Sequence, residues 1–202
     1  MYGLDFSPGT LTAVVVALGF AAGLNVYATV LALGVMARLH WVMLPAGLEV
    51  LANEWVIGAS GVLFAGEFVA DKIPGFDLVW NALHTFVRIP VAALLAYGAG
   101  QHLSPGMHLL VTCVGAGIAA VAHGSKTVAR VAVTPSPEPF SNIALSTAED
   151  GVAIGLSWVA LHHPVAGSAV VVGLIVSTGA AAWWAARRIR SGWRGVRERW
   201  QG

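Results

Sequence analysis

The sequence has little charge and almost no cysteine. Only 10% of its 202 residues are charged and 57% are hydrophobic, whereas a soluble domain carries roughly 25% charged residues. The single cysteine, Cys113, excludes an intrachain disulfide and is interpreted as a small core residue. No Lys or Arg precedes the first apolar run, as the basic region of a cleaved signal peptide would require. We therefore expect an integral membrane protein that retains its first apolar run.

The familiar catalytic motifs are also missing. The sequence has no HExxH, Walker loop, GxSxG or CxxC, so the common hydrolase, nucleotide-binding and thiol-redox chemistries have no support. We expect no cofactor and favour a function other than catalysis. The adjacent His162 and His163 could hold a metal ion, but without nearby acids they are more typical of a membrane interface. Whether a metal binds elsewhere stays open at this level.

Long apolar runs predict an all-α fold: a polytopic membrane bundle of about six spans in one domain, residues 1–202. The predicted spans are residues 10–39, 55–71, 76–97, 106–133, 142–161 and 165–186. The first would measure about 45 Å as a straight helix, against a hydrocarbon core of about 30 Å. The fourth is also over-long. We therefore predict a break in the first span near Gly23 and Asn25, and another in the fourth at His123 and Gly124.

The order of the runs predicts a repeat and a topology. A long broken run opens each half, residues 10–98 and 106–186, which suggests a three-plus-three inverted repeat. The basic tail, residues 187–202, places the C-terminus in the cytoplasm, and six spans would place the N-terminus there too. We expect the tail to lie near anionic lipid and expect no nucleic-acid partner. The predicted location is a bacterial inner membrane.

The densest polar stretch, EFVADKIPGFDLVWNALHTFVR, lies between two apolar runs. On a helix, Glu67 and Asp71 share one face at i, i+4. Asp77, His84 and Arg88 share another face after the Pro-Gly turn. Ionisable groups so close to hydrocarbon are costly and usually face a protein interior or a water-filled cavity. This spacing predicts one half of a membrane site.

A second polar region completes the predicted site. His123, Lys126 and Arg130 recur at i, i+3, i+7 and form one basic stripe, which the acids Glu149 and Asp150 can meet from the next span. The predicted cavity is lined by Asn25, Tyr27, Glu67, Asp71, Lys72, Asp77, His84, Arg88, His123, Lys126, Arg130, Asn142, Glu149 and Asp150. The alternative is that these residues only hold helices together, as an Asn in a membrane helix often does.

These motifs together resemble a known family. GLNVYAT, the stretch above and HGSKTVARVAVTPSPEPFSNIALSTAED are similar to a bacterial family of small membrane proteins, domain of unknown function 4126, over about residues 18–161. The resemblance assigns to a first signature Glu67, Asp71, Lys72, Pro74, Asp77, Trp80, His84, Thr85 and Arg88. It assigns to a second His123, Lys126, Arg130, Pro137, Glu138, Pro139, Ser141, Asn142, Glu149 and Asp150. Asn81, where an acid is expected, and Ile89, which displaces Pro90 by one place, depart from the pattern.

The family name supplies no activity, so three functions stay open. The leading hypothesis is a transporter or channel-like carrier of a small ion or polar solute, motivated by the ionisable groups inside apolar runs. The second is a lipid-directed protein, a flippase or an enzyme acting on a phosphorylated lipid, since the basic cluster suits an anionic head group. The third is a membrane scaffold. The lipid bilayer is the expected partner, and the Gly- and Ala-rich helix faces would suit a homodimer.

Overall fold

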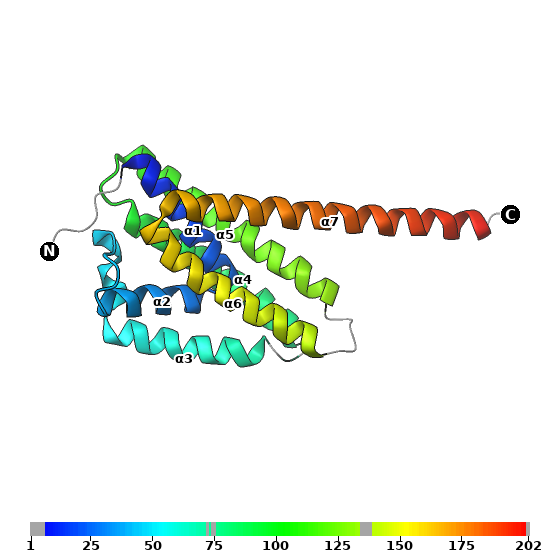
Figure 1. Ribbon diagram of the computed structural model, residues 1–202, viewed down its shortest axis with the longest axis horizontal. Coiled ribbons are helices and arrows are strands. Elements are labelled where there is room, and N and C mark those ends of the chain that lie inside the picture. Colours follow the sequence, from blue (N-terminus) through cyan, green and yellow to red (C-terminus); the bar gives the residue numbers. More distant parts are fainter. Residues whose placement is uncertain (1–6, 72, 74–75, 134–138, 201–202) are drawn as a thin grey trace.

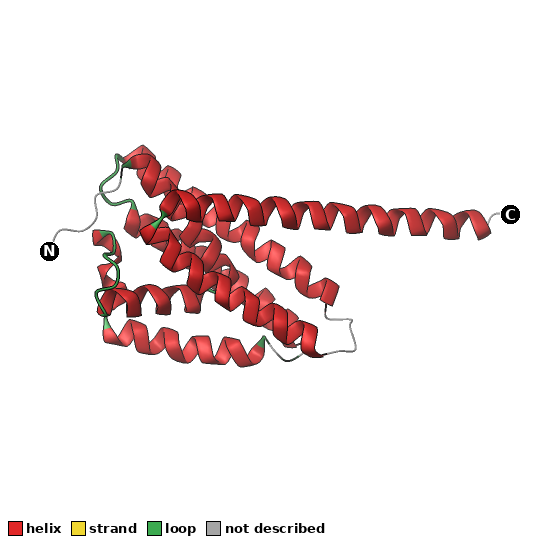
Figure 2. Ribbon diagram, viewed as in Figure 1, coloured by secondary structure: helices red, strands yellow, loops and turns green. Residues whose placement is uncertain are grey.

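The computed structural model describes residues 7–71, 73, 76–133 and 139–200, and within these residues the chain is helical, without a strand. Figure 2 shows helices joined by short loops. The side chains of residues 77–78, 130–133, 139, 141–142, 185 and 188–200 lie outside this description. The elements are α1 (Pro8–Leu24), α2 (Val26–Arg38), η1 (Ala46–Ala52), α3 (Glu54–Ala70), α4 (Phe76–Ala99), α5 (Pro105–Val133), α6 (Pro139–His162) and α7 (Pro164–Trp200). The predicted all-α fold is confirmed.

The first apolar run breaks at Asn25, as predicted, but the chain then turns back instead of continuing across the bundle. α1 runs parallel to α5, since Gly19 lies against Gly115 and Gly23 against Ala119. α2 runs antiparallel to α3. α1 and α3 both run away from the end of the bundle at which the chain begins (Figure 1). The two half-helices therefore form a re-entrant pair that meets at Asn25 in the interior of the bundle.

The predicted break in the fourth run is wrong. α5 is one continuous helix through His123 and Gly124. Its length, about 43 Å, exceeds a hydrocarbon core of about 30 Å. A helix may protrude beyond the core without breaking, and a lone glycine costs only about 1 kcal/mol in a helix. The length of an apolar run therefore does not by itself require a break.

The helices after the re-entrant pair alternate in direction from α3 to α7 (Figure 1). α1 begins at one end of the bundle, and α7 ends at the other. Six crossings with both termini on one side are therefore not confirmed. An inverted repeat would make α1 and α5 antiparallel, whereas they are parallel. The predicted repeat is not supported, because the reversal at Asn25 leaves its first half without a crossing that matches α5.

Within the described residues, three helical segments are long and apolar enough to cross a membrane, namely Val79–Ala99, Pro105–Ala129 and Pro164–Trp184. η1 and α3 together would form a fourth crossing, with a bend of 68° between them. α1 and α2 are apolar but shorter. Eleven of the seventeen residues of α1 are buried, so this half-helix forms the centre of the bundle and the others surround it.

Candidate functional site

Asn25 organises the break between α1 and α2. Its backbone is extended (φ −148°, ψ 103°), and its side-chain oxygen accepts the backbone N–H of Ala28 at 2.9 Å, as an N-cap does. Its amide nitrogen donates to Asp150 Oδ1 at 2.8 Å, although 125 residues separate the two in the chain. Asn25 is fully buried. The Ala28 N–H at the break and the Asn25 side chain are thus satisfied within the protein.

The break also frees the carbonyl of Leu24. In a continuous helix this oxygen would accept the N–H of Ala28, which here donates to Asn25 instead. The freed oxygen accepts a hydrogen bond of 3.1 Å from Lys126 Nζ on α5. Because Leu24 is the last residue of α1, the negative end of that helix's dipole also points toward the ammonium group.

Lys126 is surrounded by oxygen atoms from three further side chains. Its Nζ donates to Asp71 Oδ2 at 2.8 Å and lies 3.3 Å from Glu149 Oε2 and 3.7 Å from Glu67 Oε1. Lys126 itself is only 2% exposed. We call the oxygens of Leu24, Glu67, Asp71 and Glu149 the oxygen cage. Carboxylates gathered around one ammonium supply the charge pairing that a buried cation requires.

Arg88 on α4 forms the second centre of the site. Its guanidinium pairs with Glu67 and donates to Asn81, and both Arg88 and Glu67 have no exposed surface. The same guanidinium donates to His123 Nδ1 at 2.9 Å. Since an arginine cannot accept a hydrogen bond, this histidine nitrogen carries no proton. Glu67 therefore joins the Arg88 centre to the oxygen cage.

The histidines make further contacts. With Nδ1 accepting, the neutral ring of His123 carries its proton on Nε2, which donates to Thr85 Oγ1 at 2.7 Å. His84 donates from Nδ1 to the carbonyl of Trp80 at 2.7 Å, and its Nε2 contacts the Tyr27 hydroxyl at 3.2 Å. The ring of Tyr27 lies edge-on to His84, at a centroid distance of 5.6 Å. Tyr27, on α2, thus forms a separate pair with His84.

The structure brings ten of the predicted cavity residues into contact, in three groups. Glu67, Asp71, Arg88, His123, Lys126 and Glu149 form the largest group, Asn25 pairs with Asp150 at the α1–α2 break, and Tyr27 contacts His84. Lys72 lies outside the described residues, and so do the side chains of Asp77, Arg130 and Asn142. Whether the ten residues line a functional pathway stays a prediction.

Sequence reasoning missed several members of the network. Asn81 was noted only as a departure, yet it accepts from Arg88 and donates to Thr127 Oγ1 at 3.2 Å. Thr127 lies four residues after His123, a helical spacing that could have indicated it. The carbonyl of Leu24 had no signal of its own, since only the break makes a backbone oxygen available.

Some buried polar atoms have no hydrogen-bond partner among the described residues. They include Glu67 Oε2, Arg88 Nε and Ser146 Oγ, and all three residues are fully buried. Such atoms usually mark a site for an unseen group or a functional constraint. Across the described part of the chain, no three His, Cys, Asp or Glu side chains are arranged to hold a metal ion.

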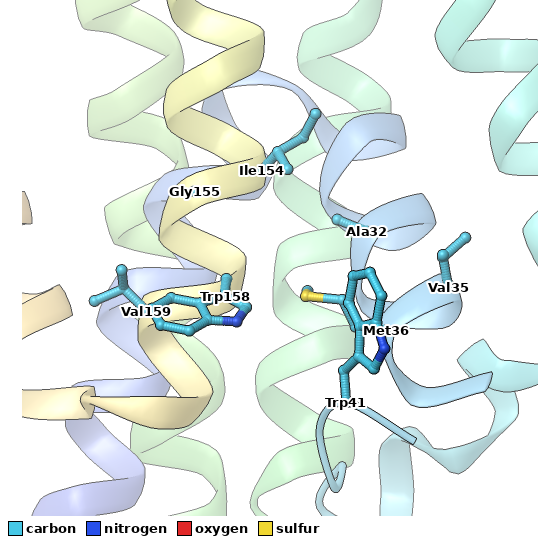
Figure 3. Close-up of a pocket in the computed structure, with 8 residues that line it drawn as sticks. All are labelled: Ala32, Val35, Met36, Trp41, Ile154, Gly155, Trp158 and Val159. Carbon is cyan, nitrogen blue, oxygen red and sulfur yellow. The ribbon is translucent and has the colours of Figure 1, made fainter. Parts of the chain in front are cut away.

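Two apolar grooves lie beside α2. One, of about 500 Å³, separates α2 from α6 (Figure 3) and is lined by Ala32, Val35, Met36, Trp41, Ile154, Gly155, Trp158 and Val159. The other, of about 520 Å³, lies among α2, η1, α3 and α4. Tyr27 lines this second groove while its hydroxyl contacts His84. The second groove therefore reaches the Tyr27–His84 pair.

Apolar helices of crossing length around a buried set of ionisable residues are the features of a polytopic membrane protein. The chain belongs to the family described as Domain of unknown function (DUF4126), whose pattern it matches over residues 12–187. This confirms the resemblance found in the sequence. No curated protein and no solved structure matches the chain. The function must therefore be argued from the site.

Proposed function

We propose that the protein is a carrier or channel-like transporter of a small ion or polar solute, and that the structure is its occluded state. The observation that supports this most is the buried network at the re-entrant break. Glu67, Arg88 and Lys126 are at most 2% exposed, in a bundle of apolar helices. Transporters place such charges, and interrupted helices, where they bind an ion or solute.

The roles follow from the contacts. Glu67 and Glu149 would carry a proton or cation, because both lie against Lys126, and Glu67 also pairs with Arg88. His84 would relay protons at Tyr27, since its Nε2 contacts the Tyr27 hydroxyl. Arg88 and Lys126 would be the counter-charges. The basic tail, residues 187–202, would lie in the cytoplasm of a bacterial cell, with the start of α1 on the other side of the inner membrane.

Flux measurements test this proposal. The purified chain is reconstituted into liposomes that contain a pH-sensitive dye, and gradients of H⁺, Na⁺, K⁺ or NH₄⁺ are imposed one at a time. We expect a protein-dependent flux for at least one ion. Glu67→Gln and Glu149→Gln should each lower it at least tenfold, because each removes a charge at the oxygen cage.

Glu54→Gln is the matched control, since Glu54 lies at the surface of α3, paired with the exposed Arg38. It should leave the flux unchanged. Thermal unfolding and gel filtration establish that all variants are folded. A scaffold would show lost stability without any flux, whereas unaltered flux in both cage variants would remove the roles assigned to Glu67 and Glu149.

A second candidate, a lipid-directed protein, is favoured by the groove that ends at Tyr27. Its volume, about 520 Å³, suits an acyl chain, and its walls are apolar residues of α2, α3 and α4. An amphiphile could lie there with its polar group toward His84. Native mass spectrometry of the purified protein would then show a bound anionic lipid, and Ser60→Trp, which fills the groove, would abolish it.

A further inference from the structure

Lys126 Nζ occupies a place that resembles a binding site for a free cation. Its hydrogen-bond and ion-pair partners among the described residues are oxygen atoms: the Leu24 carbonyl at 3.1 Å and the carboxylates of Asp71, Glu149 and Glu67 at 2.8, 3.3 and 3.7 Å. These oxygens come from α1, the end of α3 and α6, whereas the ammonium comes from α5. The oxygens of the site and the ammonium that occupies it thus come from different helices.

Two features of the cage favour a cation and do not depend on Lys126. The Leu24 carbonyl is free because Asn25 caps Ala28, and this arrangement does not involve Lys126. The C-terminal end of α1 adds roughly half a negative charge from the helix dipole. A site of oxygen acceptors with this negative field suits an ammonium ion and does not suit an anion.

A second observation is that Lys126 does not pair with every acceptor oxygen of the cage residues. Glu67 Oε2 is fully buried and has no hydrogen-bond partner among the described residues. Ser146 Oγ is also fully buried and has no hydrogen-bond partner among the described residues. Ser146 shares one face of α6 with Glu149, at i, i+3. The Glu67 oxygen is therefore an acceptor at the cage for a donor that Lys126 does not supply.

We infer that the oxygen cage is a binding site for a small monovalent cation, in which the Lys126 ammonium is the built-in occupant. The bound ion and the lysine exclude one another. A cation can enter only when the ammonium leaves the cage, so Lys126 limits the cage to one positive charge. That this cation is the transported ion rests on the proposed function, whereas its binding does not.

Chemical rescue of Lys126→Ala tests the inference. This substitution removes three methylene groups and the amine, a volume that matches propylammonium. The thermal midpoint of the purified full-length variant is measured with ethyl-, propyl- and butylammonium chloride at constant ionic strength, with choline chloride as the bulky control. We expect Lys126→Ala to unfold at a lower temperature than the wild type, and propylammonium to raise its midpoint by about 2–4 °C.

The controls separate a specific site from a salt effect. The wild type, whose cage is filled, should not respond, and Lys126→Ala combined with Glu67→Gln should lose the rescue. Lys126→Met is the second variant: its side chain ends near the position of the lysine ε-carbon, so NH₄⁺ should rescue it better than propylammonium. If Lys126→Ala aggregates alone, recovery of folded protein with propylammonium, but not with choline, gives the same support.

Equal effects of propylammonium and choline, or no effect on either variant, would overturn the inference. These outcomes are distinct from the flux result. Rescue without flux would establish the cation site and remove the carrier function. Flux without rescue would leave the carrier and remove the oxygen cage as its cation site.

Discussion

Asn25 on the re-entrant pair donates a hydrogen bond of 2.8 Å to Asp150 on α6, and both residues are buried. The same asparagine caps α2 through the N–H of Ala28. One side chain therefore performs two tasks, since it ends the unwound turn and ties it to the helix that supplies Glu149 to the oxygen cage. Stability and the geometry of the site are coupled at this residue.

Replacing Asn25 by alanine should cost more than the loss of an ordinary cap. A cap is worth about 1 kcal/mol, and removing a buried donor from a charged acceptor adds about 1–3 kcal/mol. We expect Asn25→Ala to lose about 2–4 kcal/mol, measured by reversible unfolding in detergent. Asn53 provides the matched control, because it caps α3 at an exposed site through Trp55. If Asn53→Ala cost as much as Asn25→Ala, the bond to Asp150 would contribute nothing.

Asn25→Asp should make stability depend on pH. The aspartate keeps the capping oxygen for Ala28, but it faces Asp150 with a second carboxylate. Two close carboxylates disfavour the doubly charged form, and one proton between them restores a donor. The variant should therefore be less stable than the wild type at neutral pH and approach it as pH falls. Thermal midpoints measured across pH 4–8 check this, and a constant deficit would contradict it.

The sequence was sufficient to locate the charged residues of the site, because few ionisable groups interrupt its apolar runs. It was not sufficient to pair them. Glu67 and Asp71 share one helix face, yet Glu67 pairs with Arg88 and Asp71 with Lys126. Helical spacing shows which residues share a face, but not which helices pack together. The pairings depend on contacts between helices that are distant in the chain.

The two predicted breaks show a similar limit. Both long runs exceeded the membrane thickness, but only the run that contains Asn25 breaks. That asparagine offers an oxygen for the freed N–H of Ala28. The side chain of His123 instead contacts Thr85 and Arg88 on another helix. The reversal of α2 could not be predicted either, because the angle between two helices joined by one residue cannot be inferred from the sequence.

Arg88 and Glu67 should be strongly coupled in a double-mutant cycle. Removing one partner of a buried ion pair leaves an uncompensated charge and costs about 3–5 kcal/mol. We expect Arg88→Met and Glu67→Gln each to lower stability while the chain stays folded in detergent, and to show a coupling energy of about 1–3 kcal/mol together. Arg38 and Glu54 form the comparison, because their exposed pair should couple by about 0–1 kcal/mol. Equal coupling in the two cycles would show that burial does not set the strength of the Arg88 pair.

Tyr27→Phe tests the Tyr27–His84 contact independently of the oxygen cage. The hydroxyl contacts His84 Nε2 at 3.2 Å and has no described role in the oxygen cage. Its loss should cost about 0.5–1.5 kcal/mol of stability, as for one hydrogen bond. If His84 relays protons, proton flux should fall several-fold in the liposome assay while the fold is retained. Unchanged flux would remove Tyr27 and His84 from the pathway and leave the Lys126 cage unaffected.

Gly23 and Gly124 should respond to alanine in opposite directions. A Cβ at Gly23 would lie 2.5 Å from the Ala119 carbonyl and 2.7 Å from the Ala122 side chain, so Gly23→Ala should destabilise by about 1–3 kcal/mol. A Cβ at Gly124 meets nothing within 4 Å, and α5 is continuous there, so Gly124→Ala should stabilise by about 0.5–1 kcal/mol. Unfolding of both variants in detergent checks this. A destabilised Gly124→Ala would show that α5 needs a flexible point at the position where the sequence predicted a break.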